Sequence, residues 1–327
     1  MQSPSSRESP VPDASAAPQA PRSGAGTAIL TFFVVAGSAL LFSAKGILAK
    51  LAYREGADAM TVLALRTGMS LPLFAGVLWW TNRRAAERLT LRDWRSLTVV
   101  GFFGWYLASW LDFKGLEHIS AGLERIVLFT YPIMVVLATA VRRRQMPGLL
   151  MSAATVAAWA GVAVAFAGEA RAGASPRGEL WLGTMLVFYG AVSYTVFILI
   201  SGDMVKRLGS LRFIAAVATV SSILMLVHWA CVKPVSSLLT LPPGVWRYGI
   251  LLTILSTIVP SFLTGWGLRL AGSQRFAVIG SIGPAGTLVM AALWLGESVD
   301  AARLGGLLLT LAGSVAATLL KDSPRGQ

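Results

Sequence analysis

Two stretches of sequence, LFTYPIMVV at residues 128–136 and GSIGPAGTLV at residues 280–289, place a proline in the middle of an apolar segment. Each proline removes a backbone donor, so the carbonyls of Leu128 and Gly280 lose their helical partners and both helices bend. Pro132 and Pro284 lie 152 residues apart. Sliding the chain by 152 or 153 residues also aligns Gly37 with Gly190, Gly56 with Gly209, Gly115 with Gly267 and Gly161 with Gly313. The spacing predicts two copies of one unit.

The composition excludes a soluble globular enzyme. Of 327 residues, 55% are hydrophobic and only 13% are charged, and the mean hydropathy is +0.67. Soluble domains carry about 25% charged residues. In a soluble protein the net charge of +13 would point to a nucleic-acid partner. In a membrane protein that charge belongs first to the loops, so we expect a lipid bilayer and no nucleic acid as partner.

Ten stretches are long enough to cross about 30 Å of hydrocarbon as helices. They are residues 28–50, 59–80, 96–116, 119–141, 148–168, 180–201, 211–232, 245–268, 276–296 and 302–320. The sequence therefore predicts an all-α integral membrane protein of ten transmembrane helices. Five helices per copy force the second copy to enter the membrane from the opposite side, so the two repeats are inverted.

The same division predicts the domain boundaries. We expect a first five-helix repeat at 27–169 and a second, inverted one at 179–321. Residues 1–26 hold five prolines and few bulky apolar side chains, which predicts a disordered cytoplasmic tail. Residues 322–327 form a second short cytoplasmic tail.

Basic residues in the loops predict the orientation. With both termini inside, the cytoplasmic segments hold 17 Lys and Arg residues and the outer segments hold 8. Cytoplasmic loops retain positive charge. We therefore expect a multi-pass protein of the inner (plasma) membrane with both termini in the cytoplasm.

Five charged residues remain within the predicted spans, and all belong to the first copy: Lys45, Arg66, Asp112, Glu124 and Arg125. Counted from the span ends at 1.5 Å per residue, they lie roughly 6 to 11 Å below the outer boundary and form one layer. The equivalent positions of the second copy are neutral: Ile198, Thr219, Thr264, Phe276 and Ala277. Each embedded charge needs a partner, a wet cavity or a route to the interface.

Two functional interpretations of this layer compete. In one, the two carboxylates pair with the cations as an outer gate. In the other, Arg66 or Arg125 binds a substrate carboxylate, for which a planar guanidinium is suited. The structural alternative is a snorkelling Lys45 with static ion pairs around it. Glu124 could also exchange a proton with solvent, although adjacent Arg125 favours its ionised form.

The kinked spans predict a central cavity, because freed carbonyls at membrane depth need protein or water beside them. Pro132, Pro284, Tyr131 and Trp105 are the lining candidates, with a packed structural kink and core packing as the alternatives. Small residues at four-residue spacing in 148–168 and 302–320 favour close helix packing within the chain, or else the seam of a homodimer.

The stretch IGPAGTLVMAALWLGESVDAARLGGLLLTLAGSV at 282–315 resembles the EamA family of the drug/metabolite transporter superfamily. The matching residues are Pro284, Gly296, Glu297, Gly305 and Gly313. The first copy departs from the pattern, because Gln145 stands at the position of Glu297. Because the first copy lacks a glutamate at this position, its role is not required in both copies. This indicates that Glu297 caps or packs the end of its helix. The resemblance implies a carrier of small organic metabolites, commonly outward, including amino acids.

We therefore expect a secondary transporter of amino-acid-like or other carboxylate-bearing solutes that works by alternating access. A membrane-embedded enzyme is the alternative, but no catalytic constellation is apparent. A non-transporting scaffold would leave the charged layer without a use. We expect no cofactor, because no phosphate-binding GxxxxGK[ST] loop is present. We also expect no metal, because His118, His228 and Cys231 lack ligand spacing.

Overall fold

The computed structural model describes residues 25–85, 87–142, 144, 148–173 and 176–321. The tail predicted at 322–327, most of the tail predicted at 1–26, and Gln145 lie outside the described residues. The first helix begins at Ala25, so the last two residues of the predicted disordered segment are helical instead.

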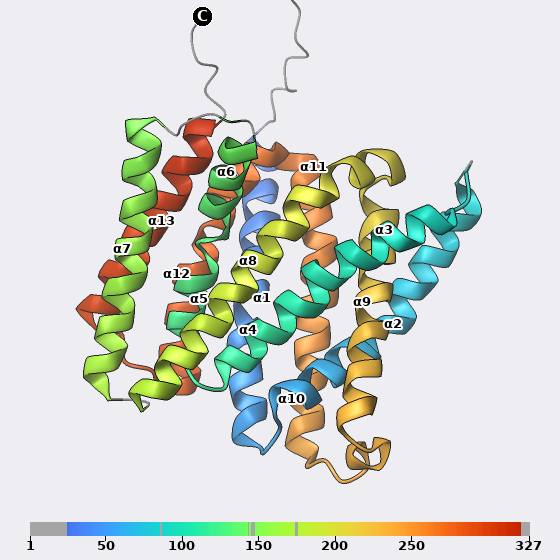
Figure 1. Ribbon diagram of the computed structural model, residues 1–327, viewed down its shortest axis with the longest axis horizontal. Helices are drawn as coiled ribbons and strands as arrows, with labels where there is room; N and C mark the ends of the chain where they lie inside the picture. The colour runs from blue at the N-terminus through green and yellow to red at the C-terminus, as the bar shows by residue number, and fades with distance from the viewer. Residues whose placement is uncertain (1–24, 86, 143, 145–147, 174–175, 322–327) are drawn as a thin grey trace, which may run out of the picture.

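Helices make up the fold, and the described residues contain no strand (Figure 1). The first half comprises α1 (Ala25–Arg54), α2 (Ala59–Arg84), α3 (Leu91–Gly101), the π-helical turn η1 (Phe102–Leu107), α4 (Ala108–Leu116), α5 (Ala121–Leu128), α6 (Tyr131–Arg142) and α7 (Leu149–Ala172). The second half comprises α8 (Arg177–Leu208), α9 (Ser210–Val232), the 3₁₀ turn η2 (Val235–Leu238), α10 (Pro243–Thr253), the π-helical turn η3 (Ile254–Ile258), α11 (Val259–Gly280), α12 (Ile282–Met290), the π-helical turn η4 (Ala291–Leu295) and α13 (Ala301–Lys321).

The described residues include seven helical stretches that are long and apolar enough to cross a membrane. They are Ile29–Arg54, Ala59–Arg84, Ala121–Arg142, Leu149–Ala172, Arg177–Leu208, Ser210–Val232 and Pro243–Gly272. Two shorter apolar helices, Ile282–Leu295 and Ala301–Ala317, follow them. The protein is therefore a multi-pass membrane protein. The predicted span 96–116 lies within the continuous helical stretch from Leu91 to Leu116, which begins with charged residues at Arg92 and Asp93.

Both prolines of the repeat follow a helix break. α5 ends at Leu128, and the turn at Phe129 and Thr130 separates it from α6, whose second residue is Pro132. α11 ends at Gly280, and the turn at Ser281 separates it from α12, which contains Pro284. The breaks stand 152 residues apart, as the sequence offset predicts, because proline cannot donate to the carbonyl four residues earlier.

Two further backbone features recur at the same offset. The turn η1 begins at Phe102 and η3 begins at Ile254, again 152 residues later. Gly56 and Gly209, which the offset also pairs, have φ values of 91° and 77° and close the turns after α1 and α8. Positive φ is costly for residues with a Cβ. The repeat therefore extends from sequence to backbone conformation.

Helices at equivalent places in the two halves pack against each other in opposite directions. Gly161 of α7 lies against Thr310 and Gly306 of α13, while Gly313 of α13 lies against Ala154 and Ala158 of α7. The numbers rise along one helix as they fall along the other, so the pair is antiparallel. A Cβ on Gly313 would lie 2.4 Å from the carbonyl oxygen of Ala154, which explains the glycine.

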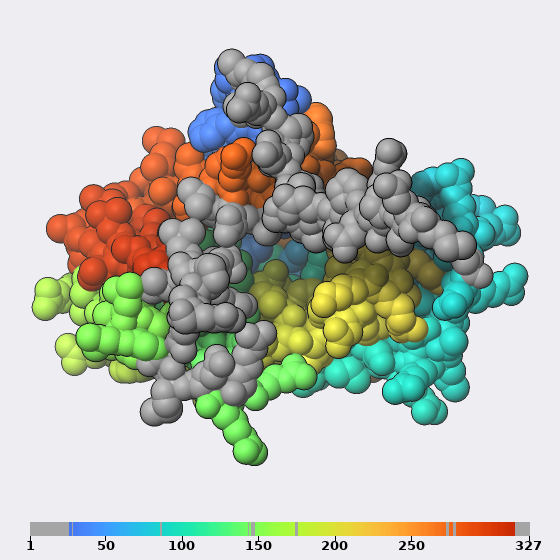
Figure 2. Space-filling model, turned by 90° about the horizontal axis from the view of Figure 1, so that it is seen from above, coloured from blue at the N-terminus to red at the C-terminus, as the bar shows by residue number. Residues whose placement is uncertain are grey.

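The α2 and α9 pair is also antiparallel, because Asp58 lies beside Lys233 at one end and Asn82 lies beside Arg212 at the other. Figure 2 shows the first of these pairs from above, with α13 (red) beside α7 (green). α1 packs along α11, and α8 packs along α4. The two halves are thus interleaved, and the core between α1, α2, α4 and α10 buries Leu63, Phe113 and Leu252.

Candidate functional site

Three of the charged side chains meet between the first, third and fourth predicted spans. Lys45 Nζ on α1 donates to Glu124 Oε1 on α5 at 3.0 Å and also to Asp112 Oδ2 on α4. Asp112 and Glu124 are 4% and 1% exposed. Asp112 Oδ1 has no hydrogen-bond partner among the described residues. One ammonium group therefore serves two buried carboxylates, which leaves one excess negative charge when all three groups are ionised.

The local sequence explains why Glu124 reaches this place. Ser120 caps α5, with its hydroxyl accepting from the Leu123 N–H at 3.1 Å, so Glu124 falls in the first turn. Gly46 lets α1 approach α5, because a Cβ there would lie 3.3 Å from Glu124 Oε2 and 3.5 Å from Ala121 Cβ. The close approach brings Lys45, one residue earlier, to the carboxylate.

Arg66 on α2 lies close to this triad but forms no ion pair with it. Its guanidinium carbon lies 5.5 Å from the centroid of the Phe113 ring, and Lys45 Nζ lies 5.6 Å from the same centroid. Its Nε donates to Thr257 Oγ1 at 2.8 Å. No salt bridge to Arg66 occurs within the described part of the chain. The guanidinium is held by a hydroxyl and an aromatic face, and its charge is not neutralised by a contact.

A small cavity of about 20 Å³ lies next to the Arg66 side chain, which is room for about one water molecule. Its lining is rich in hydroxyl groups and comprises Leu63, Arg66, Thr67, Ser70, Trp105, Ser109, Ser221, Ser222 and Thr257. Trp105 belongs to η1 and Thr257 belongs to η3, at positions that the 152-residue offset makes equivalent. The cavity therefore lies where equivalent parts of the two halves face each other.

Arg125 follows Glu124 in α5 but contacts other helices. Its terminal nitrogen donates to Ser43 Oγ of α1 at 2.9 Å, and its Nε donates to Thr287 Oγ1 of α12 at 3.2 Å. Ser43 Oγ in turn donates to the Gly283 carbonyl, directly before Pro284, at 2.7 Å. Arg125 thus joins the two halves beside the break between α11 and α12, and it too forms no salt bridge with a described residue.

The other sequence candidates divide between the cavity and the packing around it. Trp105 lines the cavity and packs edge-on against Phe74, with ring centroids 6.0 Å apart. Tyr131 instead packs edge-on against Tyr194 at 5.0 Å. Tyr131, Pro132 and Pro284 are not among the residues lining this cavity.

Glu297 does cap a helix, as the sequence predicts, but the helix belongs to the other half. Its carboxylate accepts from the backbone N–H groups of Ala121 at 2.8 Å and Gly122 at 3.2 Å, at the start of α5. A carboxylate at a helix N-terminus satisfies free donors and opposes the helix dipole. Glu297 therefore fixes the first turn of α5, the turn that carries Glu124.

Sequence reasoning missed a buried ion pair beside this cap. Glu169 at the end of α7 lies 3.4 Å from Arg303 at the start of α13, and the two residues are 1% and 3% exposed. Glu169 also accepts from the Ser120 N–H at 2.8 Å. Both residues fall at predicted span ends, where charges are ordinary, so no signal distinguished them. The hydroxyl partners Ser43, Thr257 and Thr287 were missed because serine and threonine are common in membrane helices.

Ion pairs also tie α2 to α9 on the face that the sequence assigns to the outside. Lys233 lies 2.8 Å from Asp58, the cap of α2. Burial raises the pKa of Asp58, but hydrogen bonds from Lys233 and Thr61 outweigh it and hold the pKa below its usual value. The Ala59 N–H donates to Glu117 at 2.6 Å, which joins the start of α2 to the end of α4. These contacts join α2, α4 and α9 on that face.

Comparison with known proteins identifies the family to which this architecture belongs. The model of the EamA-like transporter family matches residues 29–167 and again residues 181–319. The chain belongs to the EamA-like transporter family. Its two matched segments, each close to 140 residues by these bounds, coincide with the two copies described above. Membership in this family indicates that the protein is a transporter.

Two relatives of this EamA-like chain carry transporter names. The uncharacterized transporter YcbK of Bacillus subtilis is 28% identical over 294 residues, which cover 86% of this chain and 91% of the relative. The uncharacterized transporter sll1319 of Synechocystis is 27% identical over 206 residues, covering 61% and 59% respectively. One solved crystal structure, 17% identical, matches with a TM-score of 0.58 over 90% of this chain and 99% of that chain, which shows a shared fold.

Proposed function

We propose that this protein is a secondary carrier that moves small carboxylate-bearing organic solutes, amino-acid-like solutes among them, by alternating access. It acts in the inner (plasma) membrane, with ten transmembrane helices in two inverted repeats and both termini in the cytoplasm. We also propose that it exports these solutes from the cell, and this direction is supported only by the resemblance to the family. The observation that carries the substrate class is Arg66, a guanidinium without a carboxylate partner, beside a hydroxyl-lined cavity between the two halves.

The cavity has the composition that a carboxylate site needs. Arg66 supplies a planar fork of donors for two carboxylate oxygens, and the surrounding Ser and Thr hydroxyls can adapt to either donors or acceptors on the solute. An embedded charge that lacks a partner is costly, and such charges mark substrate pathways in membrane proteins. At about 20 Å³ the cavity is too small for an organic solute, so the structure represents a closed form that must open to bind.

The antiparallel pairs support inverted repeats. In an inverted arrangement each helix of one half runs opposite to its counterpart, as α7 and α13 do. Solute sites of such carriers lie near the bilayer midplane at the repeat interface. The recurring turns η1 and η3 reach the cavity from both sides of that interface, and π-helical turns are frequent at functional sites.

The test is ligand-induced thermal stabilisation of the purified protein, using metabolites in pairs that differ only as carboxylate and amide. A bound solute raises the apparent melting temperature by mass action. We expect carboxylates alone to stabilise the wild-type protein. Arg66→Gln should weaken that effect by about tenfold to a hundredfold in ligand concentration, since one charge-assisted contact contributes roughly 1.5–3 kcal/mol.

Arg92→Gln is the matched control, because Arg92 is exposed near the start of α3 and does not line the cavity. It removes the same charge and should leave ligand stabilisation and transport unchanged. In transport assays Arg66→Gln and Arg125→Gln should each reduce flux more than protein abundance. Equal stabilisation by acid and amide, or equal losses of flux and abundance, would contradict the proposal.

A further inference from the structure

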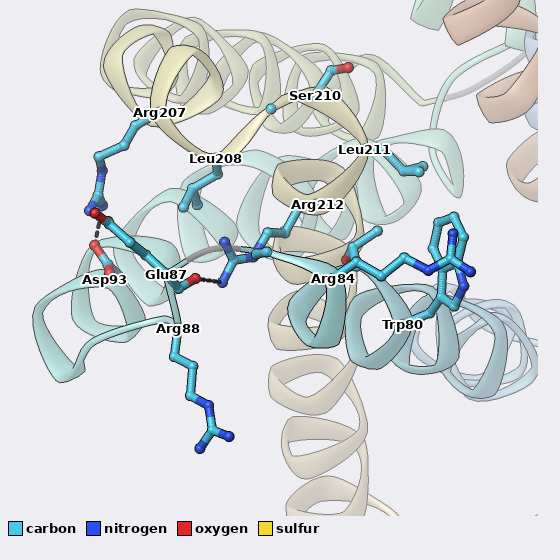
Figure 3. A pocket seen from close by; sticks show the side chains of 13 residues that line it. Trp80, Arg84, Glu87, Arg88, Asp93, Arg207, Leu208, Ser210, Leu211 and Arg212 are labelled. Carbon is cyan, nitrogen blue, oxygen red and sulfur yellow. Dashed lines mark hydrogen bonds and ion pairs between the residues drawn. The ribbon is translucent and has the colours of Figure 1, made fainter.

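A second, larger cavity of about 690 Å³ opens at the end of the molecule where α2 and α8 end and α3 and α9 begin (Figure 3). It lies on the face that the loop charges assign to the cytoplasm, away from the Arg66 cavity. Four arginines line it, Arg84, Arg88, Arg207 and Arg212, together with the two carboxylates of Glu87 and Asp93. Counted as full charges, the lining therefore carries an excess of two positive charges.

Among the described residues, only one of these arginines is paired with a carboxylate. Arg207 forms an ion pair with Asp93, and this contact holds the pKa of Asp93 well below its usual range. In Figure 3 the Arg88 side chain points away from that pair, and Arg84 extends over Trp80. The Arg84 guanidinium carbon lies 4.3 Å from the Trp80 ring centroid. Neither side chain forms an ion pair with a residue that the structure describes, so their guanidinium donors are available to a ligand.

Arg212 provides an independent indication that this cavity binds an anion. The residue is only 9% exposed, and its guanidinium donates to Asn82 Oδ1 and, at 3.0 Å, to the backbone carbonyl of Glu87. Both acceptors are neutral. Its Nε is buried and has no hydrogen-bond partner among the described residues. A buried charge with only neutral partners and an unsatisfied donor is costly, and an anion in the cavity would remove that cost.

The mouth of the cavity also carries the features of a membrane interface. Trp79 and Trp80 are 57% and 44% exposed, and Arg83 and Arg84 stack on their rings at 4.0 and 4.3 Å. Tryptophan concentrates at the level of lipid head groups, and arginine there meets lipid phosphates. The basic lining is thus placed at the depth of the head groups of one leaflet.

We propose that this cavity binds a phosphate anion, and that its source is the head group of an anionic phospholipid. Arg212 contacts the phosphate from the start of α9, and the exposed side chains of Arg84 and Arg88 turn toward it from the α2 end and the loop that follows. The bound lipid then ties the α2–α3 connection to the α8–α9 connection. A soluble phosphate compound would bring the same chemistry to the same arginines, and the test separates the two sources.

The experiment uses the full-length protein in detergent and measures retained lipid by native mass spectrometry and melting temperature by thermal shift. Phosphatidylglycerol is compared with phosphatidylcholine, and inorganic phosphate is added in a third arm. We expect one retained phosphatidylglycerol per protein and a raised melting temperature. The double variant Arg84→Gln, Arg88→Gln changes two exposed residues, so it should fold, and it should lose retention by about tenfold or more.

Arg92→Gln, Arg95→Gln is the matched control, because it removes two exposed charges from the adjoining α3 outside the cavity. It should retain phosphatidylglycerol as the wild type does. The folded fraction of Arg212→Gln should lose phosphatidylglycerol as the Arg84→Gln, Arg88→Gln variant does. If inorganic phosphate but not phosphatidylglycerol raised the melting temperature, and the Arg84→Gln, Arg88→Gln variant lost that increase, the phosphate site would be supported and its ligand would be a soluble phosphate compound. The proposal would be overturned if neither phosphatidylglycerol nor inorganic phosphate bound or stabilised the protein more than phosphatidylcholine does. It would also be overturned if the control variant lost as much phosphatidylglycerol as the Arg84→Gln, Arg88→Gln variant.

Discussion

Lys45 is the residue of the first half whose charge is shared by two buried carboxylates. It is the partner of two carboxylates that are almost entirely removed from water, Asp112 and Glu124. Removing one partner of a buried ion pair typically costs 3–5 kcal/mol, because the remaining charge stays buried. Here the loss of one ammonium would leave two such charges adjacent to each other.

Lys45→Met should therefore destabilise the protein by about 3–5 kcal/mol at neutral pH. The triple variant Lys45→Met, Asp112→Asn, Glu124→Gln should regain most of that loss, since no buried charge is then left unpaired. Thermal unfolding of the purified variants measures both effects. If Lys45→Met were as stable as the wild type, the ammonium would have no structural role, and the triad would have to be reinterpreted.

The breaks in the fourth and ninth predicted spans are properties of whole elements. Where α5 meets α6 and where α11 meets α12, the chain turns two or three residues before a proline. The Glu297 cap holds the start of α5, and Arg125 joins α5 to α1 and α12. We therefore expect the carrier to bend at these breaks when it changes conformation.

Pro132→Ala and Pro284→Ala should each slow the conformational change without abolishing solute binding. Alanine restores the missing N–H donor, so the helix can continue through the break and becomes stiffer. Flux measured in liposomes should fall while ligand-induced stabilisation persists. Pro72→Ala in α2 is the control, because Pro72 lies within an unbroken helix and has no counterpart in the second half. Wild-type kinetics in both variants would contradict a hinge.

The start of α3 is capped by a titratable residue, Asp93, so we expect its contribution to stability to depend on pH. Thr90 and Asp93 form a capping box, in which the Asp93 N–H donates to Thr90 Oγ1 at 3.2 Å and the Thr90 N–H donates to Asp93 Oδ2 at 2.9 Å. Arg207 adds an ion pair that lowers the pKa of Asp93. A lowered pKa in the folded state means that the ionised form stabilises the fold above the unfolded value of about 3.9.

Asp93→Asn should thus cost about 1–2 kcal/mol at pH 7, as expected for loss of a charged cap contact. The difference in melting temperature between wild type and variant should shrink as the pH falls below about 4, where protonation begins to remove the contribution from the wild type. A difference that stays constant from pH 7 to pH 3 would contradict this assignment.

The packing of α7 on α13 sets the distance between the two halves at one end of the whole molecule. A Cβ on Gly306 would lie 2.6 Å from the Gly161 carbonyl oxygen and 2.8 Å from Ala165 Cβ, whereas a Cβ on neighbouring Gly305 meets nothing within 4 Å. The two adjacent glycines therefore differ only in the surface they face.

Gly306→Ala should destabilise the protein by about 1–3 kcal/mol, the usual cost of forcing a methyl group into a packed seam. Gly305→Ala should be neutral or stabilising by up to about 1 kcal/mol, because alanine favours the helix. Thermal unfolding of the two variants provides a matched comparison. Equal effects would show that the seam is looser than the structure indicates.

Apolar length and glycine and proline spacing were enough to predict the membrane class, most span positions and the sequence repeat. Pairings between distant helices were not predictable, since nothing in the sequence links Glu169 to Arg303 or Arg66 to Thr257. The start of α3 did carry a signal, the Thr90-Leu91-Arg92-Asp93 capping pattern, and hydropathy alone placed the span five residues late. The π-helical turns depend on packing and left no local pattern.

The reciprocal seam between α7 and α13 also has a consequence for synthesis. Ala158 and its partner Thr310 are separated by 152 residues, which a ribosome adds in roughly 8–30 s at 5–20 residues per second. During that interval the glycine face of α7 is in the membrane without α13. Two nascent chains held close together on one messenger could bury these faces against each other, so slower translation of the second half should increase mispaired dimers.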